Sequence, residues 1–549
     1  MRFVSGAFLQ LSTSKFITLK IIRMTSSITS FENKSGTEQE LILKQRHLEN
    51  EKFTKMRLEQ MQSNSNRNWY PHKFEYTVTI SEFVAKFSSM RFGDKEAETP
   101  IRLCGRVNKI RAHGKFLCFL DLYQNEANVQ LKAKADVYLR DFSSDMGIIK
   151  RGDIIGVEGY PTVTKSGELT LLLNSTTMLA PTMKHIPTQA LERTELRYRA
   201  RYIDLLTNWE TRAIFRTKSR VLNLIRTFLD EKDFIEVETP VLTNGIGGAN
   251  ADAFKTYHND LKMDMCLRIA PELHLKTLLV GGLDRVYEIG RQFRNEGIDS
   301  SHNPEFTSCE FYMAYADYND LLGITEDLFS HIAKTLWKAP STPNLEKNRE
   351  LYEHLVERPY KRLEFISSLE SATGVPFPNA TDLTDDSGEA VKFLSSLCQK
   401  RDIAITENKT SKLLDKLFSK LIEPELKLPT FVLHHPMCMC PLAKEHRSIK
   451  GISERFELFV KGLEVVNAYT ELNDPIEQKL QFQKQKNYKS VEIQDGTLET
   501  EFVNALEYGL PPTAGWGLGV DRLIMLLTGK TSIKDVLLFP TMKPTLQHV

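Results

Sequence analysis

Residues 509–522 read Gly-Leu-Pro-Pro-Thr-Ala-Gly-Trp-Gly-Leu-Gly-Val-Asp-Arg. Glycines at 515, 517 and 519 carry no side chain, so the backbone there can approach a ligand such as a nucleotide closely. Tight packing of a strand on a helix would account for the same glycines. Arg522 ends the stretch, and its planar guanidinium can donate two parallel hydrogen bonds to a phosphate. The stretch therefore indicates either a nucleotide site or a tightly packed core strand.

Three other stretches carry residues of the same kinds. They are Phe234-Ile-Glu-Val-Glu-Thr-Pro240; Arg291-Gln-Phe-Arg-Asn-Glu-Gly297 with His302-Asn-Pro-Glu-Phe306 and Glu310-Phe-Tyr-Met313; and residues 457–471, which begin and end with glutamate. Binding a polyphosphate requires cations that neutralise several negative charges held close together. Arg294 and Arg522 suit that task, although a lone arginine more often forms a surface ion pair.

Composition narrows the class of protein before any motif is used. The 549 residues include 72 Lys and Arg against 71 Asp and Glu, with 41% hydrophobic and 26% charged residues. This is ordinary globular composition, and the balanced charge means that nucleic-acid binding would depend on local patches. No apolar run approaches the roughly 20 residues of a membrane helix, so we expect no membrane partner. Seven cysteines fit a reducing compartment rather than a disulfide scaffold.

The N-terminal part divides into two segments. Residues 1–30 hold basic, hydroxyl and apolar residues but no acidic ones, since Glu32 is the first. They are typical of a transit peptide or of a disordered leader. Met24 offers a second start, so we expect a cytoplasmic protein with a mitochondrial form through the first 23 residues. Residues 31–70 predict a charged helix over 38–62, which either lies on a nucleic-acid backbone or presents a solvated face.

The rest of the chain divides into two predicted domains. Residues 71–185 contain five short β-rich runs, which predict an OB-fold barrel of the kind that binds single-stranded nucleic acid. The runs are 101–107, 116–122, 129–133, 154–159 and 169–173. Residues 186–549 form the second domain, with a helix predicted over 215–229, a strand over 234–239 and a helical insertion over about 330–425.

The four stretches, in this order, resemble the signature motifs of class II aminoacyl-tRNA synthetases. The closer likeness is to the lysyl-tRNA synthetase family of eukaryotes. It rests on Arg-Ile-Ala-Pro-Glu-Leu at 268–273, Arg-Asn-Glu-Gly-Ile at 294–298, Ala-Tyr-Thr-Glu-Leu-Asn-Asp-Pro at 468–475 and Leu-Pro-Pro-Thr-Ala-Gly-Trp-Gly at 510–517. The resemblance implies an α+β fold, with an antiparallel-sheet catalytic domain, an N-terminal OB barrel and a homodimer whose interface includes the segment ending at Pro240.

The resemblance also implies roles in ATP binding. Arg294 and Arg522 become the catalytic residues, Arg294 on the α-phosphate and the amino-acid carboxylate and Arg522 on the γ-phosphate. Phe306 would stack on the adenine. Further ATP-binding residues are Glu296, His302, Asn303, Glu464 and Gly519. Glu457 and Glu464 would hold Mg²⁺ between the phosphates, because this ion prefers hard oxygen ligands.

A lysine substrate needs a carboxylate for each of its two ammonium groups. Glu272 would bind the α-ammonium, while Glu471, with Asn467 and Tyr312, would bind the ε-ammonium. Gly248 would let the main chain approach the substrate, and Glu310 completes the set of lysine-binding residues. An aspartate-charging relative would need a cation at Glu471, so the residues favour lysine over aspartate or asparagine.

In such a protein the barrel reads the tRNA anticodon. Phe116 or Phe119 would stack on a base, and Gln130 and Glu168 would read base edges. The spacing does not decide between the two phenylalanines.

The resulting hypothesis is a lysine–tRNA ligase with L-lysine, ATP and tRNA(Lys) as partners. It would form lysyl-adenylate and then transfer the lysyl group to the 3′ end of the tRNA, without a protein nucleophile. Two alternatives remain: a protein that binds tRNA without charging it, and an aspartyl or asparaginyl relative.

Overall fold

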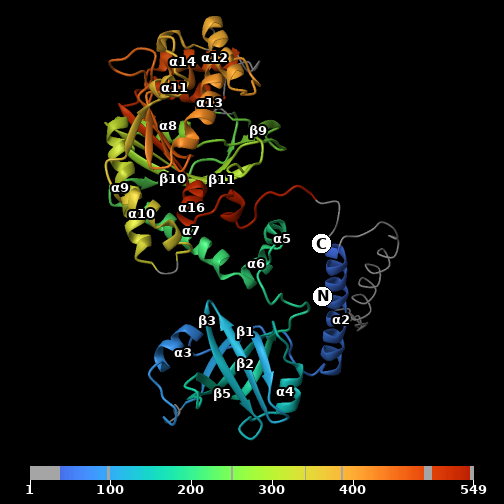
Figure 1. The fold of residues 1–549 in the computed structure, drawn as a ribbon. Helices are drawn as coiled ribbons and strands as arrows, with labels where there is room; N and C mark the ends of the chain where they lie inside the picture. Colours follow the sequence, from blue (N-terminus) through green and yellow to red (C-terminus); the bar gives the residue numbers. More distant parts are fainter. Residues whose placement is uncertain are drawn as a thin grey trace, which may run out of the picture. The chain divides into compact units, whose positions relative to one another are not determined.

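The computed structural model describes residues 38–94, 99–245, 247–248, 251–339, 342–384, 387–487 and 497–544. The predicted leader, residues 1–30, lies outside them. The chain forms two units that divide between Ile186 and Pro187 (Figure 1).

The first unit contains a closed five-stranded barrel with the strand order β1-β2-β3-β5-β4. Its strands are β1 (Ile101–Ala112), β2 (Leu117–Gln124), β3 (Ala127–Lys134), β4 (Ile154–Val163) and β5 (Leu169–Ala180). Neighbours are antiparallel except β3 and β5. Alternate residues such as Leu120, Leu131 and Leu171 are fully buried inside, as the period of a strand requires. The prediction of an OB-fold barrel is confirmed, with strands longer than the sequence pattern suggested.

Three helices accompany the barrel: α2 (Glu38–Ser63), α3 (Ile80–Phe87) and α4 (Phe142–Ile148). The side chain of Arg57 on α2 is fully buried and donates to both carboxylate oxygens of Asp153, at 2.9 and 3.0 Å. It also donates to the backbone oxygen of Ile148 (2.7 Å). The C-terminal half of α2 is therefore packed against the barrel on the side that carries Arg57.

The second unit is built on an eight-stranded sheet in the order β12-β13-β14-β15-β16-β11-β10-β6. Its strands are β6 (Ile235–Glu236), β10 (Arg285–Phe293), β11 (Glu305–Ala314), β12 (Lys361–Glu364), β13 (Thr430–Leu433), β14 (Arg455–Val460), β15 (Leu463–Thr470) and β16 (Thr513–Gly519). The six central strands are antiparallel, and only the two edge pairs are parallel. The predicted antiparallel-sheet domain is confirmed. A small second sheet contains β7 (Leu242–Thr243), β8 (Lys255–His258) and β9 (Met263–Leu267).

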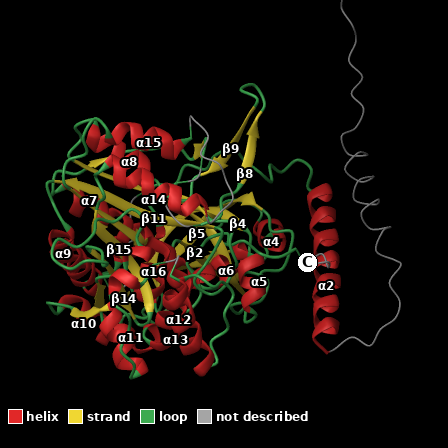
Figure 2. Ribbon diagram, turned by 90° about the horizontal axis from the view of Figure 1, so that it is seen from above, coloured by secondary structure: helices red, strands yellow, loops and turns green. Residues whose placement is uncertain are grey.

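Helices cover both faces of the large sheet. On one face, α7 (Trp209–Asp230), α9 (Tyr318–Trp337) and α16 (Val520–Thr528) enclose the main apolar core with Phe311 and Trp516. On the other, α8 (Glu272–Val280), α14 (Pro475–Asn487) and α15 (Leu498–Leu506) pack together (Figure 2). Two short helices, α5 (Thr194–Arg199) and α6 (Arg201–Thr207), begin the unit.

Two predicted elements differ in extent. The helix predicted over 215–229 lies inside α7, but the strand predicted over 234–239 shrinks to the two residues of β6. Beyond β6 the backbone makes one further bond to β10, from Val237 to the backbone oxygen of Tyr287 (2.9 Å), and Thr239 instead bonds through its side chain to Glu288. The segment 330–425 holds the end of α9, α10 (Arg349–Val356), α11 (Phe365–Thr373), α12 (Gly388–Lys400) and α13 (Thr410–Leu421), and it also supplies the edge strand β12.

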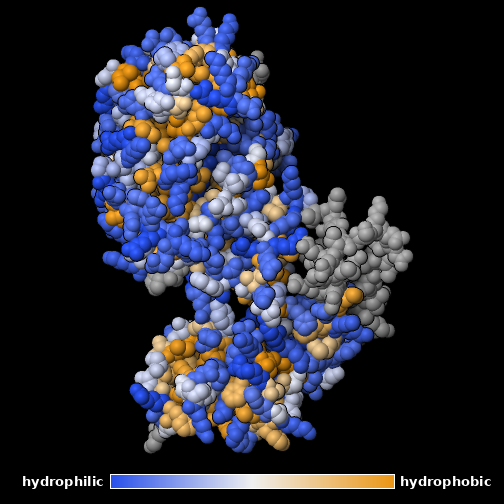
Figure 3. Space-filling view, viewed as in Figure 1, coloured by the Kyte–Doolittle hydropathy of each residue, from blue (hydrophilic) through white to orange (hydrophobic). Residues whose placement is uncertain are grey.

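The surface in view in Figure 3 is mostly hydrophilic, with apolar side chains interspersed among the charged ones. None of the helices in the described ranges is both long and apolar enough to span a bilayer.

Candidate active site

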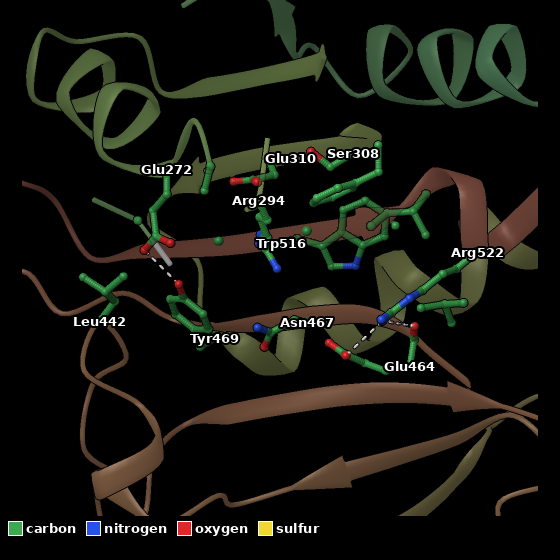
Figure 4. Close-up of a pocket in the computed structure, with 18 of the residues that line it drawn as sticks. Glu272, Arg294, Ser308, Glu310, Leu442, Glu464, Asn467, Tyr469, Trp516 and Arg522 are labelled. Atoms are coloured by element: carbon green, nitrogen blue, oxygen red, sulfur yellow. Dashed lines mark hydrogen bonds and ion pairs between the residues drawn. The ribbon is translucent and has the colours of Figure 1, made fainter. Parts of the chain in front are cut away.

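A cavity of about 420 Å³ opens over the central strands β11, β16 and β15 of the large sheet (Figure 4). It gathers residues from distant parts of the chain. The predicted site residues that line it are Gly248, Glu272, Arg294, Glu296, His302, Asn303, Phe306, Glu310, Tyr312, Glu464, Asn467, Gly519 and Arg522. Glu457 and Glu471 do not line it, and they are described below.

The glycines of β16 form part of the cavity floor. Gly515 lies opposite Tyr312 of β11 and Tyr469 of β15, while Gly517 lies opposite Glu310 and Asn467. A methyl group on Gly515 would come within 1.8 Å of Glu471 Oε1 and 2.6 Å of the Tyr312 ring. The absence of a side chain at Gly515 is therefore required by its protein neighbours, a reason that the sequence did not reveal.

A bulge between β14 and β15 brings two side chains into the cavity. Glu457 pairs with Asn467 and Leu458 with Val466, but Phe459 then pairs with Glu464. The extra residue on β15 shifts the alternation of side chains by one. As a result Glu464 and Asn467, three residues apart, both line the cavity.

Glu272 and Glu471 share one buried ammonium group. Lys276 Nζ lies 2.8 Å from Glu272 Oε1 and 2.9 Å from Glu471 Oε2. Glu471 is 1% exposed, and its Oε1 has no hydrogen-bond partner among the described residues. That atom lies within 1.8 Å of the position that a methyl group on Gly515 would take, where the Tyr312 ring also lies within 2.6 Å. The two carboxylates therefore converge, whereas the sequence suggested opposite ends of a pocket.

Glu310 occupies the middle of the cavity. Tyr312 donates a hydrogen bond to its Oε2 at 3.1 Å. Burial, reinforced by the charge of Glu272, raises the pKa of Glu310 to about 8. At neutral pH this carboxyl holds a proton in the empty cavity, and a cationic ligand beside it would favour the ionised form.

Arg294 follows β10 and points into the cavity (Figure 4). Its guanidinium carbon lies 5.1 Å from the ring centre of Phe306, within range of a cation–π contact. Its Nε donates to the backbone oxygen of Ile269 (3.4 Å), a long bond. Burial lowers the pKa of Arg294. An anion next to Arg294 would stabilise the guanidinium charge and so compensate for the hydration that burial removes.

A second arginine lies at the other end of the cavity, in the first turn of α16. Arg522 donates to the backbone oxygen (2.9 Å) and to Oε2 (3.1 Å) of Glu464. Its other amino group lies 3.1 Å from His302 Nε2. His302 in turn contacts Asp299 at 2.8 Å. Although burial opposes the shift, hydrogen bonds from Ser301 and His302 lower the pKa of Asp299 to about 2. A chain of polar contacts therefore runs at this end of the cavity from Arg522 through His302 to Asp299.

Glu457 lies on β14, directly opposite Asn467. Its carboxylate contacts His435 Nε2 (3.2 Å) and the guanidinium of Arg455. Burial would raise the pKa of Glu457, but Arg455 and then His435 lower it to about 2. Glu464 has a raised pKa, through burial and then through the charge of Glu457. The negative charges of the two carboxylates thus repel each other, and a divalent cation between them would reduce this repulsion.

Within the described ranges, no group of three or more His, Cys, Asp or Glu side chains could hold a metal. Two carboxylates suffice for Mg²⁺, because this ion commonly takes one or two carboxylates together with substrate phosphates and water. Glu464, on the cavity wall, and Glu457, on the neighbouring strand, therefore fit such an ion as hard oxygen donors.

The predicted anticodon residues lie on the barrel of the first unit. Gln130 donates to Glu168 Oε2 at 2.8 Å and accepts from Thr170 at 3.1 Å. Phe119 lies two residues before Asp121, which pairs with Gln130, so Phe119 and this polar group share one face. Phe116 precedes β2 and is 72% exposed. Phe119 is therefore the aromatic residue on the polar face.

Three residues of the site were missed by the sequence reasoning. Lys276 lies four residues after Glu272, a spacing that pairs side chains on a helix, and this signal could have revealed it. Tyr469 donates to Glu272 Oε1 at 2.8 Å and stands two residues before Glu471. Arg455 donates to Asn467 Oδ1 at 2.9 Å. No sequence signal marks Arg455.

An antiparallel sheet with arginines and carboxylates over its central strands, joined in one chain to an OB barrel, defines a class II tRNA synthetase. Residues 193–543 match the family of class II tRNA synthetases (D, K and N), and residues 101–179 match the OB-fold nucleic acid binding domain. The chain belongs to this family of tRNA synthetases.

Similar proteins are lysine–tRNA ligases. One from Cladosporium cladosporioides is 43% identical over 89% of this chain and 83% of its own length. A probable cytoplasmic lysine–tRNA ligase of Encephalitozoon cuniculi is 43% identical over 86% and 93% of the two chains. The lysine–tRNA ligase of Carboxydothermus hydrogenoformans is 39% identical over 91% of this chain and 99% of its own length.

Proposed function

We propose that the protein is a lysine–tRNA ligase that activates L-lysine with ATP and transfers it to the 3′ end of tRNA(Lys). The observation that carries the proposal is Oε1 of buried Glu471, which has no hydrogen-bond partner among the described residues and lies next to Gly515 of the cavity floor. A buried acceptor without a partner is costly, and an ε-ammonium group would satisfy it. An aspartate side chain there would add a negative charge to an acidic pocket.

In the first step the residues act by position and charge. Arg294 would hold the lysine carboxylate next to the α-phosphate, and Arg522 would hold the γ-phosphate at the other end of the cavity. Phe306 would stack on the adenine, with Glu296, His302, Asn303 and Gly519 around the nucleotide. The lysine carboxylate then attacks the α-phosphorus, and pyrophosphate leaves in line. No protein nucleophile is needed, because the reacting groups are held together.

In the lysine subsite, Glu272 and the backbone at Gly248 would take the α-ammonium. Glu471, Tyr312 and Asn467 would take the ε-ammonium, and Glu310, which accepts from Tyr312, would lie beside the bound amino acid. In the second step the terminal ribose hydroxyl of the tRNA attacks the adenylate carbonyl, and AMP is the leaving group. Glu457 and Glu464 would hold Mg²⁺, which when bound neutralises phosphate charge.

The barrel would bind the anticodon. The Gln130–Glu168 pair offers donors and acceptors to base edges, and the Phe119 ring beside it offers a stacking surface. We assign the stacking role to Phe119 because it lies on the same face as this pair, whereas Phe116 lies outside β2.

A homodimer through the segment around Pro240 is part of the proposal. Ile235, Val241 and Leu242 are 51%, 39% and 45% exposed, an apolar group that a second copy would cover. Light scattering of the purified protein tests the dimer, and a monomer at micromolar concentration would contradict it.

The compartment proposed is the cytoplasm, with a mitochondrial form through the first 23 residues. Mass spectrometry of the mature N-terminus tests that point.

Amino-acid-dependent ATP–pyrophosphate exchange tests the activity. We expect exchange with lysine and none with aspartate or asparagine. Exchange with aspartate alone would identify an aspartyl relative. Absence of exchange with every amino acid, in folded protein that still binds tRNA, would identify a binding protein.

A further inference from the structure

Lys276 is the only lysine among the described residues whose ammonium group lies between two glutamates proposed to bind substrate. It is fully buried on α8, one helical turn after Glu272. Its Nζ donates to Glu272 Oε1 and to Glu471 Oε2, at 2.8 and 2.9 Å. These two glutamates come from α8 and from the end of β15, 199 positions apart in the chain when counted from residue 272 to residue 471. One side chain therefore ties together two walls of the same subsite.

Lys276 does not compete for the substrate position. It is absent from the cavity wall and lies behind the glutamates. Its ammonium group is 5.0 Å from the ring centre of Phe502 on α15. Burial lowers the pKa of Lys276, but Glu272 and Glu471 outweigh this and raise it, so the side chain stays charged.

The contact with Lys276 divides the oxygens of each glutamate into two kinds. Glu471 commits Oε2 to Lys276 and leaves Oε1 without a partner among the described residues. Glu272 commits Oε1 to Lys276 and to Tyr469. Burial raises the pKa of Glu471, the charge of Lys276 opposes that rise, and Glu272 adds to it. Loss of the ammonium group would therefore favour a proton shared by the two carboxylates. Lys276 thus controls both the charge of the pair and which oxygen faces the substrate.

We propose that Lys276 is a positioning and specificity-determining residue, which sets the spacing of Glu272 and Glu471 and thereby selects a diamino acid by its chain length. The inference rests on the proposed function. It predicts that the enzyme discriminates lysine from ornithine, one methylene shorter, through the position of the carboxylates rather than through a steric wall.

The test is lysine- and ornithine-dependent pyrophosphate exchange with two variants. Lys276→Met keeps the length of the side chain without its charge. We expect the KM for lysine to rise about 100-fold, as for a buried ion pair that loses one partner, with the KM for ATP unchanged. Lys276→Arg keeps the charge but has a wider head group. We expect it to raise the KM for lysine about tenfold and to change the lysine-to-ornithine preference, because the carboxylates move apart.

The control is Lys530→Met, which removes another partly buried ion pair, that with Glu210 at 2.8 Å, away from the cavity. It should lower stability and leave both KM values as they are. An unchanged KM and an unchanged preference in Lys276→Arg would overturn the inference. So would a loss in Lys276→Met confined to kcat. Should Lys276→Met fail to fold, Lys276→Arg decides alone. Wild-type protein that activates no lysine would instead reject the proposed function.

Discussion

The proposed choice of lysine as the substrate depends on a single atom, Oε1 of Glu471. The side chain is buried, its Oε2 accepts from Lys276, and its Oε1, next to Gly515, has no hydrogen-bond partner among the described residues. An unsatisfied buried acceptor costs about 1–3 kcal/mol, and a hydrogen bond from a bound ammonium group would remove that cost. Selectivity for a cationic side chain would then arise because Glu471 Oε1 lacks a hydrogen-bond donor among the described residues and an ammonium group supplies one.

Glu471→Gln should weaken lysine binding selectively. The amide keeps the shape of the side chain but loses its charge, so we expect the KM for lysine in pyrophosphate exchange to rise about 100-fold while the KM for ATP stays constant. Glu326→Gln is the matched control. Glu326 lies on α9 and is also buried, but its carboxylate accepts from the backbone nitrogen of Tyr360. An unchanged lysine KM in Glu471→Gln would refute the assigned role.

Glu310 should make lysine binding depend on pH. Burial and Glu272 raise its pKa to about 8, so the empty cavity holds the proton below that pH. A bound ammonium group lowers this pKa, so binding releases a proton, and lysine affinity should rise by up to about tenfold per unit from pH 6 to 8 and then level off. Titration calorimetry measures it. Glu310→Gln should flatten the profile, and a flat profile in the wild type would contradict this assignment.

At the scale of elements, strand β16 shapes the proposed lysine subsite because Gly515 has no side chain. Gly515→Ala would place a methyl group within 1.8 Å of Glu471 Oε1 and 2.6 Å of the Tyr312 ring. Neither neighbour can move without leaving its position in the subsite, so we expect lysine activation to fall by about 100-fold or more. Gly323→Ala is the control, because nothing lies within 4 Å of a methyl group there. Activity of Gly515→Ala equal to the wild type would show that the floor adapts.

The elements also show what could be predicted from sequence. The strands of the barrel and the helix within α7 follow from periodicity, which depends on near neighbours in the chain. Two features depend on partner strands and so cannot be predicted from the periodicity of the sequence. They are the bulge that brings Glu464 and Asn467 to the same side and the shortness of β6. Most cavity residues were found through motifs. Lys276 was missed although its spacing from Glu272 is that of an ion pair on a helix, whereas its contact with Glu471 and that of Arg455 with Asn467 arise only in the fold.

At the scale of the whole molecule, the two units divide the proposed work. Phe119→Ala on the barrel should raise the KM for tRNA(Lys) in aminoacylation about tenfold, since a base loses about 1–3 kcal/mol of stacking. Pyrophosphate exchange should not change, because the cavity lies in the other unit. Phe116→Ala is the matched control and should have the smaller effect. A larger effect from Phe116→Ala would reverse the assignment.

The central claim is that the carboxylate of Glu471 receives the ε-ammonium of lysine. A crystal structure of the protein with L-lysine and a non-hydrolysable ATP analogue measures this directly. The account predicts lysine Nζ within hydrogen-bond distance of Glu471 Oε1, with the lysine carboxylate on Arg294. A bound lysine whose ε-ammonium contacts other groups, with Glu471 Oε1 still unpartnered, would contradict it.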